Sequence, residues 1–263
     1  MIRKKVGLAL SGGGARGFAH LGVLKVLAEN NIPIDCVAGT SAGSFAGAAI
    51  ASGLEIDEII DLAHKIGWFS MAGFSYSPKG ILSNAPMGNF IKKNFPVNSF
   101  EEMPIPFAAV ACDLETGEEV VMKESGDLAF AVRASCAIPG VFMPLDSENG
   151  RKLIDGGVVA PVPTRAVKNL GAEIIIAVDL LASGSTFWNS PNTMLGIFFQ
   201  SAMTLLRAAS RQQHYRADIV IMPEIAHLRM DELRKVDEFI ALGEEAALEK
   251  IDEIKALVTT PST

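Results

Sequence analysis

Ser41 stands between Gly39 and Gly43 in the spacing Gly-x-Ser-x-Gly, after a short apolar run and before a segment of small residues. Glycines permit the strained strand-to-helix turn that exposes a serine hydroxyl, so this pattern is typical of the nucleophile in an acyl-transfer enzyme. The alternative is a plain strand-to-helix junction in which Ser41 or Thr40 only caps the helix. The pentapeptide alone leaves both interpretations open.

A second glycine-rich segment, Ser11–Gly17, follows the apolar run Val6–Leu10. Its glycines match the Gly-x-Gly-x-x-Gly fingerprint of a dinucleotide site, which also lies between a strand and a helix. A dinucleotide site needs an acidic residue at the end of the next strand, to bind the ribose. Here Asp35 begins that strand and Ser41 follows its end. We therefore favour a different use of the glycine loop.

Backbone N–H groups of such a loop, together with a helix N-terminus, can stabilise an oxyanion that forms above Ser41. We expect the arginine in the loop to orient it, although a solvated arginine at a turn is an equal alternative. The residues that we assign to this oxyanion site are Gly12, Gly13, Gly14, Arg16 and Ala42.

A serine nucleophile needs a base, and histidine is the usual one. The four histidines are His20, His64, His214 and His227. Each is placed as a structural or solvated residue, in a helix or among polar neighbours. The glycine loop also follows the first strand, whereas the oxyanion loop of ordinary α/β-hydrolases follows the third. A different base is therefore expected.

Carboxylates at the ends of predicted strands are the other candidates for the base. Asp113 fits a hairpin turn and Asp179 simply ends a strand. Asp155 is followed by Gly156 and Gly157, so the backbone can approach another group closely there. An isolated Asp-Gly-Gly would be read as a turn, but beside the two glycine motifs we choose Asp155.

The segments 11–17, 39–43 and 155–157 together resemble the three signatures of the patatin-like phospholipase family, in the same order and spacing. The segment 133–144 is also similar, so the resemblance covers about residues 6–179. It implies an acyl hydrolase of lipid esters with a Ser41–Asp155 dyad, in which Ser41 is the nucleophile, Asp155 is the base, and no metal or cofactor takes part. Ser11 departs from the family, since many members carry aspartate there.

Strand, glycine loop, helix and strand follow one another from Val6 to Thr40, which predicts a βαβ crossover and a parallel sheet. Further strands are expected near 105–112, 119–122, 152–154, 173–178 and 218–222, with long helices at 191–216 and 231–258, the second interrupted near Gly243. We predict an α/β three-layer sandwich: a mainly parallel central sheet with helices on both faces. Residues 1–263 would form one domain, with a small cap from 67–100.

The run Met194–Leu206 is apolar almost all round a helix, and Phe187 and Trp188 precede it. Burial in the core is one explanation. An acyl-chain groove, a lipid interface or a contact in a homo-oligomer would also cover this surface. We expect five aromatic residues to border the acyl site or its entrance: Trp68, Phe69, Phe74, Phe198 and Phe199.

A net charge of −7 argues against nucleic acid as a partner and against attraction to anionic membranes. The apolar run Val6–Leu10 is too short for a signal peptide. Cys36, Cys112 and Cys136 lie among small apolar residues, which favours buried free thiols and offers no metal-ligand spacing. We expect a cytoplasmic protein that contacts lipid at a membrane surface. The alternative function is a non-catalytic protein of this fold that binds a lipid or a regulatory partner.

Overall fold

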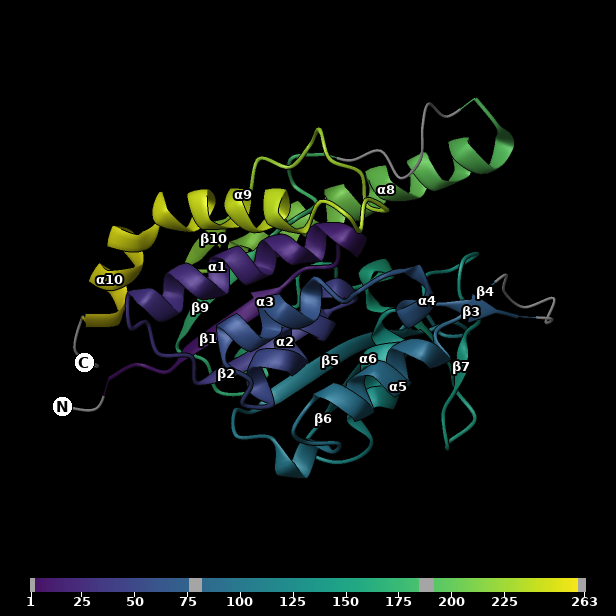
Figure 1. Ribbon diagram of the computed structural model, residues 1–263, viewed down its shortest axis with the longest axis horizontal. Coiled ribbons are helices and arrows are strands. Elements are labelled where there is room, and N and C mark those ends of the chain that lie inside the picture. The colour runs from purple at the N-terminus through teal and green to yellow at the C-terminus, as the bar shows by residue number, and fades with distance from the viewer. Residues whose placement is uncertain (1–2, 76–81, 185–191, 260–263) are drawn as a thin grey trace.

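The computed structural model describes residues 3–75, 82–184 and 192–259 (Figure 1). Within this part of the chain, eight strands form a central sheet in the order β10-β9-β1-β2-β5-β8-β7, and β6 pairs with β5. The strands are β1 (Val6–Leu10), β2 (Cys36–Thr40), β5 (Phe107–Asp113), β6 (Glu119–Lys123), β7 (Leu145–Asp146), β8 (Lys152–Asp155), β9 (Ile174–Val178) and β10 (Ile219–Ile221).

The five strands β10, β9, β1, β2 and β5 pair in parallel, whereas β6 and β8 pair with β5 antiparallel, and β7 pairs antiparallel with β8. The residues of β1, β2 and β9 are all buried, as expected for parallel strands covered on both faces. The prediction of a mainly parallel sheet is therefore confirmed.

Helices cover both faces of this sheet. Leu8, Leu10 and Val37 pack on one side against α1, α2 and α9, and Figure 1 shows these helices in front of the strands. Ala9 and Ala38, whose side chains alternate to the other face, pack against α7. The predicted three layers are confirmed. The helices are α1 (Phe18–Glu29), α2 (Ala42–Ala51), α3 (Ile56–Ala63), α4 (Trp68–Met71), α5 (Ala85–Asn94), α6 (Leu128–Ser135), α7 (Thr164–Asn169), α8 (Met194–Gln213), α9 (Val236–Leu248) and α10 (Ile251–Thr259).

Short elements complete the described chain. The segment predicted as a cap, 67–100, contains α4, the antiparallel pair β3 (Gly73–Phe74) and β4 (Leu82–Ser83), and α5. Four 3₁₀ turns are η1 (Gly14–Gly17), η2 (Phe100–Glu102), η3 (Gly156–Val158) and η4 (His214–Arg216). None of the helices described is long and apolar enough to cross a bilayer.

The predicted interruption of the last helix near Gly243 is wrong. Gly243 lies inside α9, and the break falls between Leu248 and Ile251. A Cβ at Gly243 would lie 2.0 Å from the carbonyl oxygen of Ala19, and a Cβ at Gly22 would lie 2.0 Å from that of Ile240. These glycines let the backbones of α1 and α9 touch, so Gly243 serves helix packing rather than a helix end.

Two strands meet end to end along one edge of β5. Thr40, the last residue of β2, is paired with Val110, and Asp155, the last residue of β8, is paired with the next residue, Ala111. The opposite edge of β5 is occupied by β6. Because β2 and β8 run in opposite directions, their carboxyl ends face each other. The residue after Thr40 is Ser41, which is thereby brought to Asp155.

Candidate active site

Ser41 occupies a strained turn between β2 and α2. Its φ of 54° and ψ of −125° are rarely adopted by a residue with a side chain. A Cβ at Gly39 would lie 2.3 Å from the carbonyl oxygen of Gly43, and a Cβ at Gly43 would lie 2.2 Å from that of Leu10. Gly39 therefore lets β2 approach the first turn of α2, and Gly43 lets α2 pack against β1. The Ser41 side chain makes no capping hydrogen bond to α2, so simple helix capping does not explain it.

Ser135 holds the backbone of this turn, and the sequence analysis assigned it no role. Its hydroxyl accepts the N–H of Ser41 at 2.8 Å and donates to the carbonyl of Val110 at 2.6 Å. Ser135 lies in the segment 133–144, whose similarity to the family was the available signal. Nothing in that segment's pattern indicates a contact with a strand end far away in the sequence.

Asp155 is buried, with 6% of its surface exposed. Its Oδ1 accepts the N–H of Gly157 at 2.7 Å. Burial raises the pKa of Asp155 from 3.8 to about 6, although the nearby Ser41 hydroxyl and the hydrogen bond from the Gly157 N–H act in the opposite direction. A carboxylate of near-neutral pKa in contact with a serine hydroxyl is suited to accept its proton.

The glycine loop lies directly against Ser41, since a Cβ at Gly12 would be 3.3 Å from the Ser41 Cβ. The N–H of Gly12 donates to the carbonyl of Pro161 at 3.1 Å, so it is not free to bind an oxyanion as predicted. The N–H groups of Gly13, Gly14 and Ala42 have no acceptor among the residues described. These three remain as candidate oxyanion donors.

Arg16 is fully buried, so the alternative of a solvated arginine is wrong. Its guanidinium donates to the carbonyls of Leu180, Gly184, Ala226 and Leu228. Burial lowers the pKa of Arg16 to about 10, which leaves it charged at neutral pH. Arg16 thus orients the loop, as expected, by fixing it to two later segments, and its donors are engaged there rather than at an oxyanion.

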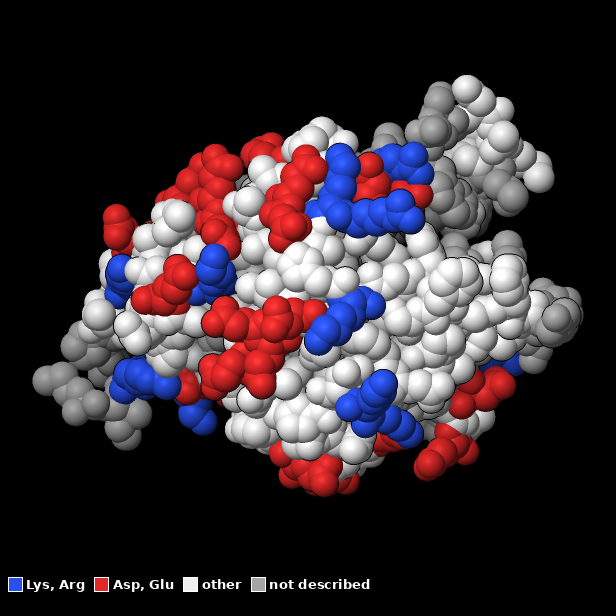
Figure 2. All heavy atoms as spheres, in the orientation of Figure 1, with Lys and Arg blue, Asp and Glu red and all other residues white. Residues whose placement is uncertain are grey.

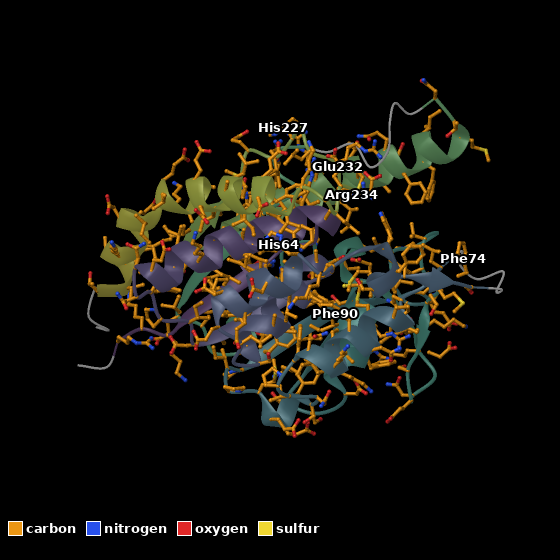
Figure 3. The ribbon with its side chains drawn as sticks, viewed as in Figure 1. His64, Phe74, Phe90, His227, Glu232 and Arg234 are labelled. Atoms are coloured by element: carbon orange, nitrogen blue, oxygen red, sulfur yellow. The ribbon has the colours of Figure 1, made fainter. Side chains whose placement is uncertain are left out.

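The four histidines have partners away from Ser41 and Asp155. These partners are Ser11 for His20, Asp237 for His64, Asp179 for His214 and Glu238 for His227. Burial lowers the pKa of His20 to about 4. Figure 3 shows His64 at the end of α3 and His227 in the loop before α9.

Within the described chain, no group of three or more His, Cys, Asp or Glu residues could hold a metal ion. The three cysteines are buried and free, as predicted.

An apolar cavity of about 500 Å³ reaches Ser41 and Ala42. Its walls come from α2, α3, α4, α5 and α8 and include three of the predicted aromatic residues, Trp68, Phe198 and Phe199. The cavity therefore connects Ser41 to apolar surface that an acyl chain could occupy.

Phe69 and Phe74 do not line this cavity, so the structure does not place them against its walls. Their residues are 92% and 84% exposed, and Figure 3 shows Phe74 on β3, away from the centre of the molecule. Successive residues of a helix point about 100° apart, so Trp68 of α4 faces the cavity while Phe69 faces outward. Phe187 and Trp188 lie outside the described residues.

Comparisons with known proteins show the family to which this chain belongs. Residues 8–168 match the family described as patatin-like phospholipase. An uncharacterized NTE family protein of Mycobacterium tuberculosis is 37% identical over 182 residues, which cover 68% of this chain and 50% of that protein. Lysophospholipase NTE1 of Pyricularia oryzae is 29% identical over 282 residues, which cover 96% of this chain and 19% of that protein.

The chain thus spans half or less of the length of these relatives. Among solved structures, VipD of Legionella pneumophila has a TM-score of 0.57 at 14% identity, over 96% of this chain and 67% of that one. This structural likeness concerns the fold. With a family match that covers more than half of its 263 residues, the chain belongs to the patatin-like phospholipase family.

Proposed function

We propose that this protein is a serine acyl hydrolase that cleaves carboxylic ester bonds of lipids with Ser41 and Asp155. The observation that carries the proposal is the end-to-end meeting of β2 and β8, which sets a hydroxyl on a strained turn against a buried carboxylate. The similarity to a lysophospholipase supports the substrate class.

In the proposed reaction, Ser41 Oγ attacks the ester carbonyl while Asp155 accepts the hydroxyl proton. The N–H groups of Gly13, Gly14 and Ala42 stabilise the tetrahedral oxyanion, and the N-terminus of α2 adds to the positive potential there. Collapse of this intermediate expels the alcohol, which takes the proton from Asp155. Water then attacks the acyl-enzyme with Asp155 as base, and Asp155 returns the proton to Ser41 Oγ as the fatty acid leaves.

We further propose that the acyl chain lies in the apolar cavity and enters it from a lipid surface. Six apolar residues of α4, β3 and α8 are exposed: Trp68, Phe69, Phe74, Met194, Ile197 and Phe198. Figure 2 shows a broad area without charged side chains over the end of the molecule that carries α4 and β3, whereas acidic residues gather over α3, α9 and α10. Contact with lipid would therefore be apolar.

The buried free thiols suit a reducing compartment such as the cytoplasm.

The test of the function is labelling with a fluorophosphonate probe, followed by a panel of esters and phospholipids of different head groups and chain lengths. Labelling and ester turnover by the wild-type protein are expected. Lipid binding without labelling or turnover would instead identify a non-catalytic binding protein.

Substitution of Gly13 by valine is expected to lower kcat about a hundredfold, because loss of one oxyanion donor typically has this effect. A Cβ at Gly13 would lie 3.1 Å from Leu180 Cδ1, so a branched side chain must displace the loop and its N–H groups. The measurement is kcat on a soluble short-chain ester, with circular dichroism to verify folding. Gly13→Ala is the graded control, with a smaller loss expected. Near-normal turnover of a folded Gly13→Val would place the oxyanion site elsewhere.

Replacement of Phe198 and Phe199 by serine is expected to reduce kcat/KM for long-chain esters about tenfold more than for short-chain esters. Both residues line the cavity, and each buried CH₂ of a chain contributes about 0.8 kcal/mol. The measurement compares kcat/KM across nitrophenyl esters of increasing chain length. Phe69→Ser, which removes an exposed ring outside the cavity, is the matched control. Equal losses at all chain lengths would assign the two rings to the core instead.

A further inference from the structure

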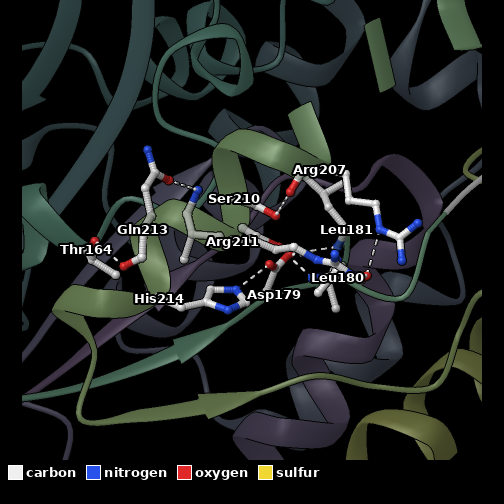
Figure 4. Close-up of polar contacts among 12 residues, drawn as sticks. Thr164, Asp179, Leu180, Leu181, Arg207, Ser210, Arg211, Gln213 and His214 are labelled. Carbon is white, nitrogen blue, oxygen red and sulfur yellow. Dashed lines mark hydrogen bonds and ion pairs between the residues drawn. The ribbon is translucent and has the colours of Figure 1, made fainter. Parts of the chain in front are cut away.

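A pair formed by a buried aspartate and a partly buried histidine lies outside the cavity. Asp179 follows β9 and is fully buried. Its Oδ2 lies 2.7 Å from Nε2 of His214, at the end of α8. Its Oδ1 accepts the N–H groups of Leu181 at 2.8 Å and Ala182 at 3.2 Å, and Figure 4 shows the carboxylate between its partners. Asp179 therefore folds the chain after β9 into a turn, which we call the 179–182 turn, and His214 fastens that turn to α8.

The 179–182 turn touches the glycine loop through Leu180. The N–H of Leu180 donates to Ser11 Oγ at 2.9 Å, and that hydroxyl donates to the carbonyl of Gly12 at 3.0 Å. The carbonyl of Leu180 accepts from Arg16. The Leu180 side chain packs against Gly13. Leu180 thus contacts the loop at its beginning, middle and end.

The end of α8 also holds the segment that follows Asp155. Gln213 accepts the N–H of Val162 at 2.7 Å and donates to the carbonyl of Val159 at 3.3 Å. Arg207 donates to the carbonyl of Ala182 at 2.9 Å, within the 179–182 turn. Figure 4 shows Arg207, Gln213 and His214 at this end of α8. The end of α8 is thereby hydrogen-bonded both to the segment after Asp155 and to the 179–182 turn.

We propose that Asp179 and His214 are positioning residues for the glycine loop, and that they fix the N–H groups of Gly13 and Gly14 relative to Ser41. The effect on catalysis rests on the proposed function, whereas the effect on the loop does not. Loss of His214 leaves the buried carboxylate with two N–H partners and no side-chain partner, which weakens the 179–182 turn. A displacement of about 1 Å in a reacting group can reduce turnover about a hundredfold.

The experiment compares three variants with the wild-type protein. His214→Leu removes the ring N–H, and His214→Gln offers an amide nitrogen where the ring has Nε2. His227→Leu is the matched control, because His227 pairs with Glu238 on the surface at 3.4 Å. The readouts are amide hydrogen–deuterium exchange of residues 11–17, kcat and KM on a soluble short-chain ester, and inhibition by a trifluoromethyl ketone, whose adduct oxyanion needs the N–H donors.

His214→Leu is expected to show faster exchange in residues 11–17, a ten- to hundredfold lower kcat with KM nearly unchanged, and weaker inhibition by the ketone. His214→Gln is expected to recover most of each loss, and His227→Leu to match the wild-type protein. Wild-type exchange in folded His214→Leu, or faster exchange with an unchanged kcat, would overturn the proposal.

If His214→Leu does not fold, Asp179→Asn replaces it. The Oδ1 of the asparagine still accepts the two N–H groups, so smaller changes of the same kind are expected, and wild-type exchange would again overturn the proposal. A wild-type protein without ester turnover would refute the proposed function, while the exchange of residues 11–17 would still decide whether the pair positions the loop.

Discussion

Ser41→Ala is expected to abolish both labelling by a fluorophosphonate and hydrolysis of esters, with a loss of at least about 10⁴-fold in kcat. The substitution removes the only atom that the proposed mechanism uses to form the acyl-enzyme. The fold is expected to survive, because the Ser41 hydroxyl caps no helix and the turn is held through the backbone N–H bound to Ser135. The measurements are gel-based probe labelling, kcat on a soluble ester, and a thermal unfolding curve.

A matched control is available in the same helix segment. Ser52 is also buried, and its hydroxyl donates to the carbonyl of Ala49 at 2.7 Å, at the far end of α2. Ser52→Ala is expected to keep both labelling and turnover. Labelling that persists in Ser41→Ala would mean that another residue is the nucleophile.

A second variant, Ser41→Gly, is expected to be about 1 kcal/mol more stable than Ser41→Ala, because glycine relieves the positive φ at that position.

The parts of this site that follow from local pattern could be predicted from the sequence. The apolar run Val6–Leu10, the glycines and the small residues after Ser41 each specify a short segment with its own backbone requirements. A Cβ added at either glycine beside Ser41 would lie within 2.3 Å of a backbone atom. No other residue therefore fits at these two positions. The parallel βαβ unit follows from the same local order.

The parts of the site that depend on pairing between segments far apart in the sequence could not be predicted. A strand was predicted near 152–154, but nothing in that segment indicates that β8 runs antiparallel to β5 and ends against β2. That direction decides whether Asp155 reaches Ser41. The partner of the Gly12 N–H, the carbonyl of Pro161, lies about 150 residues along the chain. The outward position of Phe69 depends on where a one-turn helix, α4, begins, which apolar composition does not specify.

Asp155→Asn is expected to lower kcat by about 10²- to 10⁴-fold, the usual effect of losing a general base. The raised pKa gives the reaction a pH dependence. Below about pH 6 the carboxyl is protonated and cannot accept the Ser41 proton, so kcat/KM of the wild-type protein should rise with pH through about 6 and then level off. The residual activity of Asp155→Asn should lack this rise. Asp113→Asn, at the end of β5, is the control. A wild-type rate without a rise near pH 6, or a variant of His20, His64 or His227 as inactive as Asp155→Asn, would exclude Asp155 as the base.

The same substitution is expected to stabilise the fold at neutral pH. The folded-state pKa of Asp155 lies above its ordinary value of 3.8, so the free energy of unfolding falls as pH rises from about 4 to about 6. At 1.36 kcal/mol per pKa unit, the charged carboxylate costs about 3 kcal/mol at pH 7. Asparagine stays neutral, and its Oδ1 can still accept the Gly157 N–H. Denaturant unfolding of both proteins should therefore show Asp155→Asn gaining stability over the wild-type protein between pH 4 and pH 7. A difference in stability that is constant over that range would mean that Asp155 is ionised in the folded protein at no cost, and that its burial does not prepare it to act as a base.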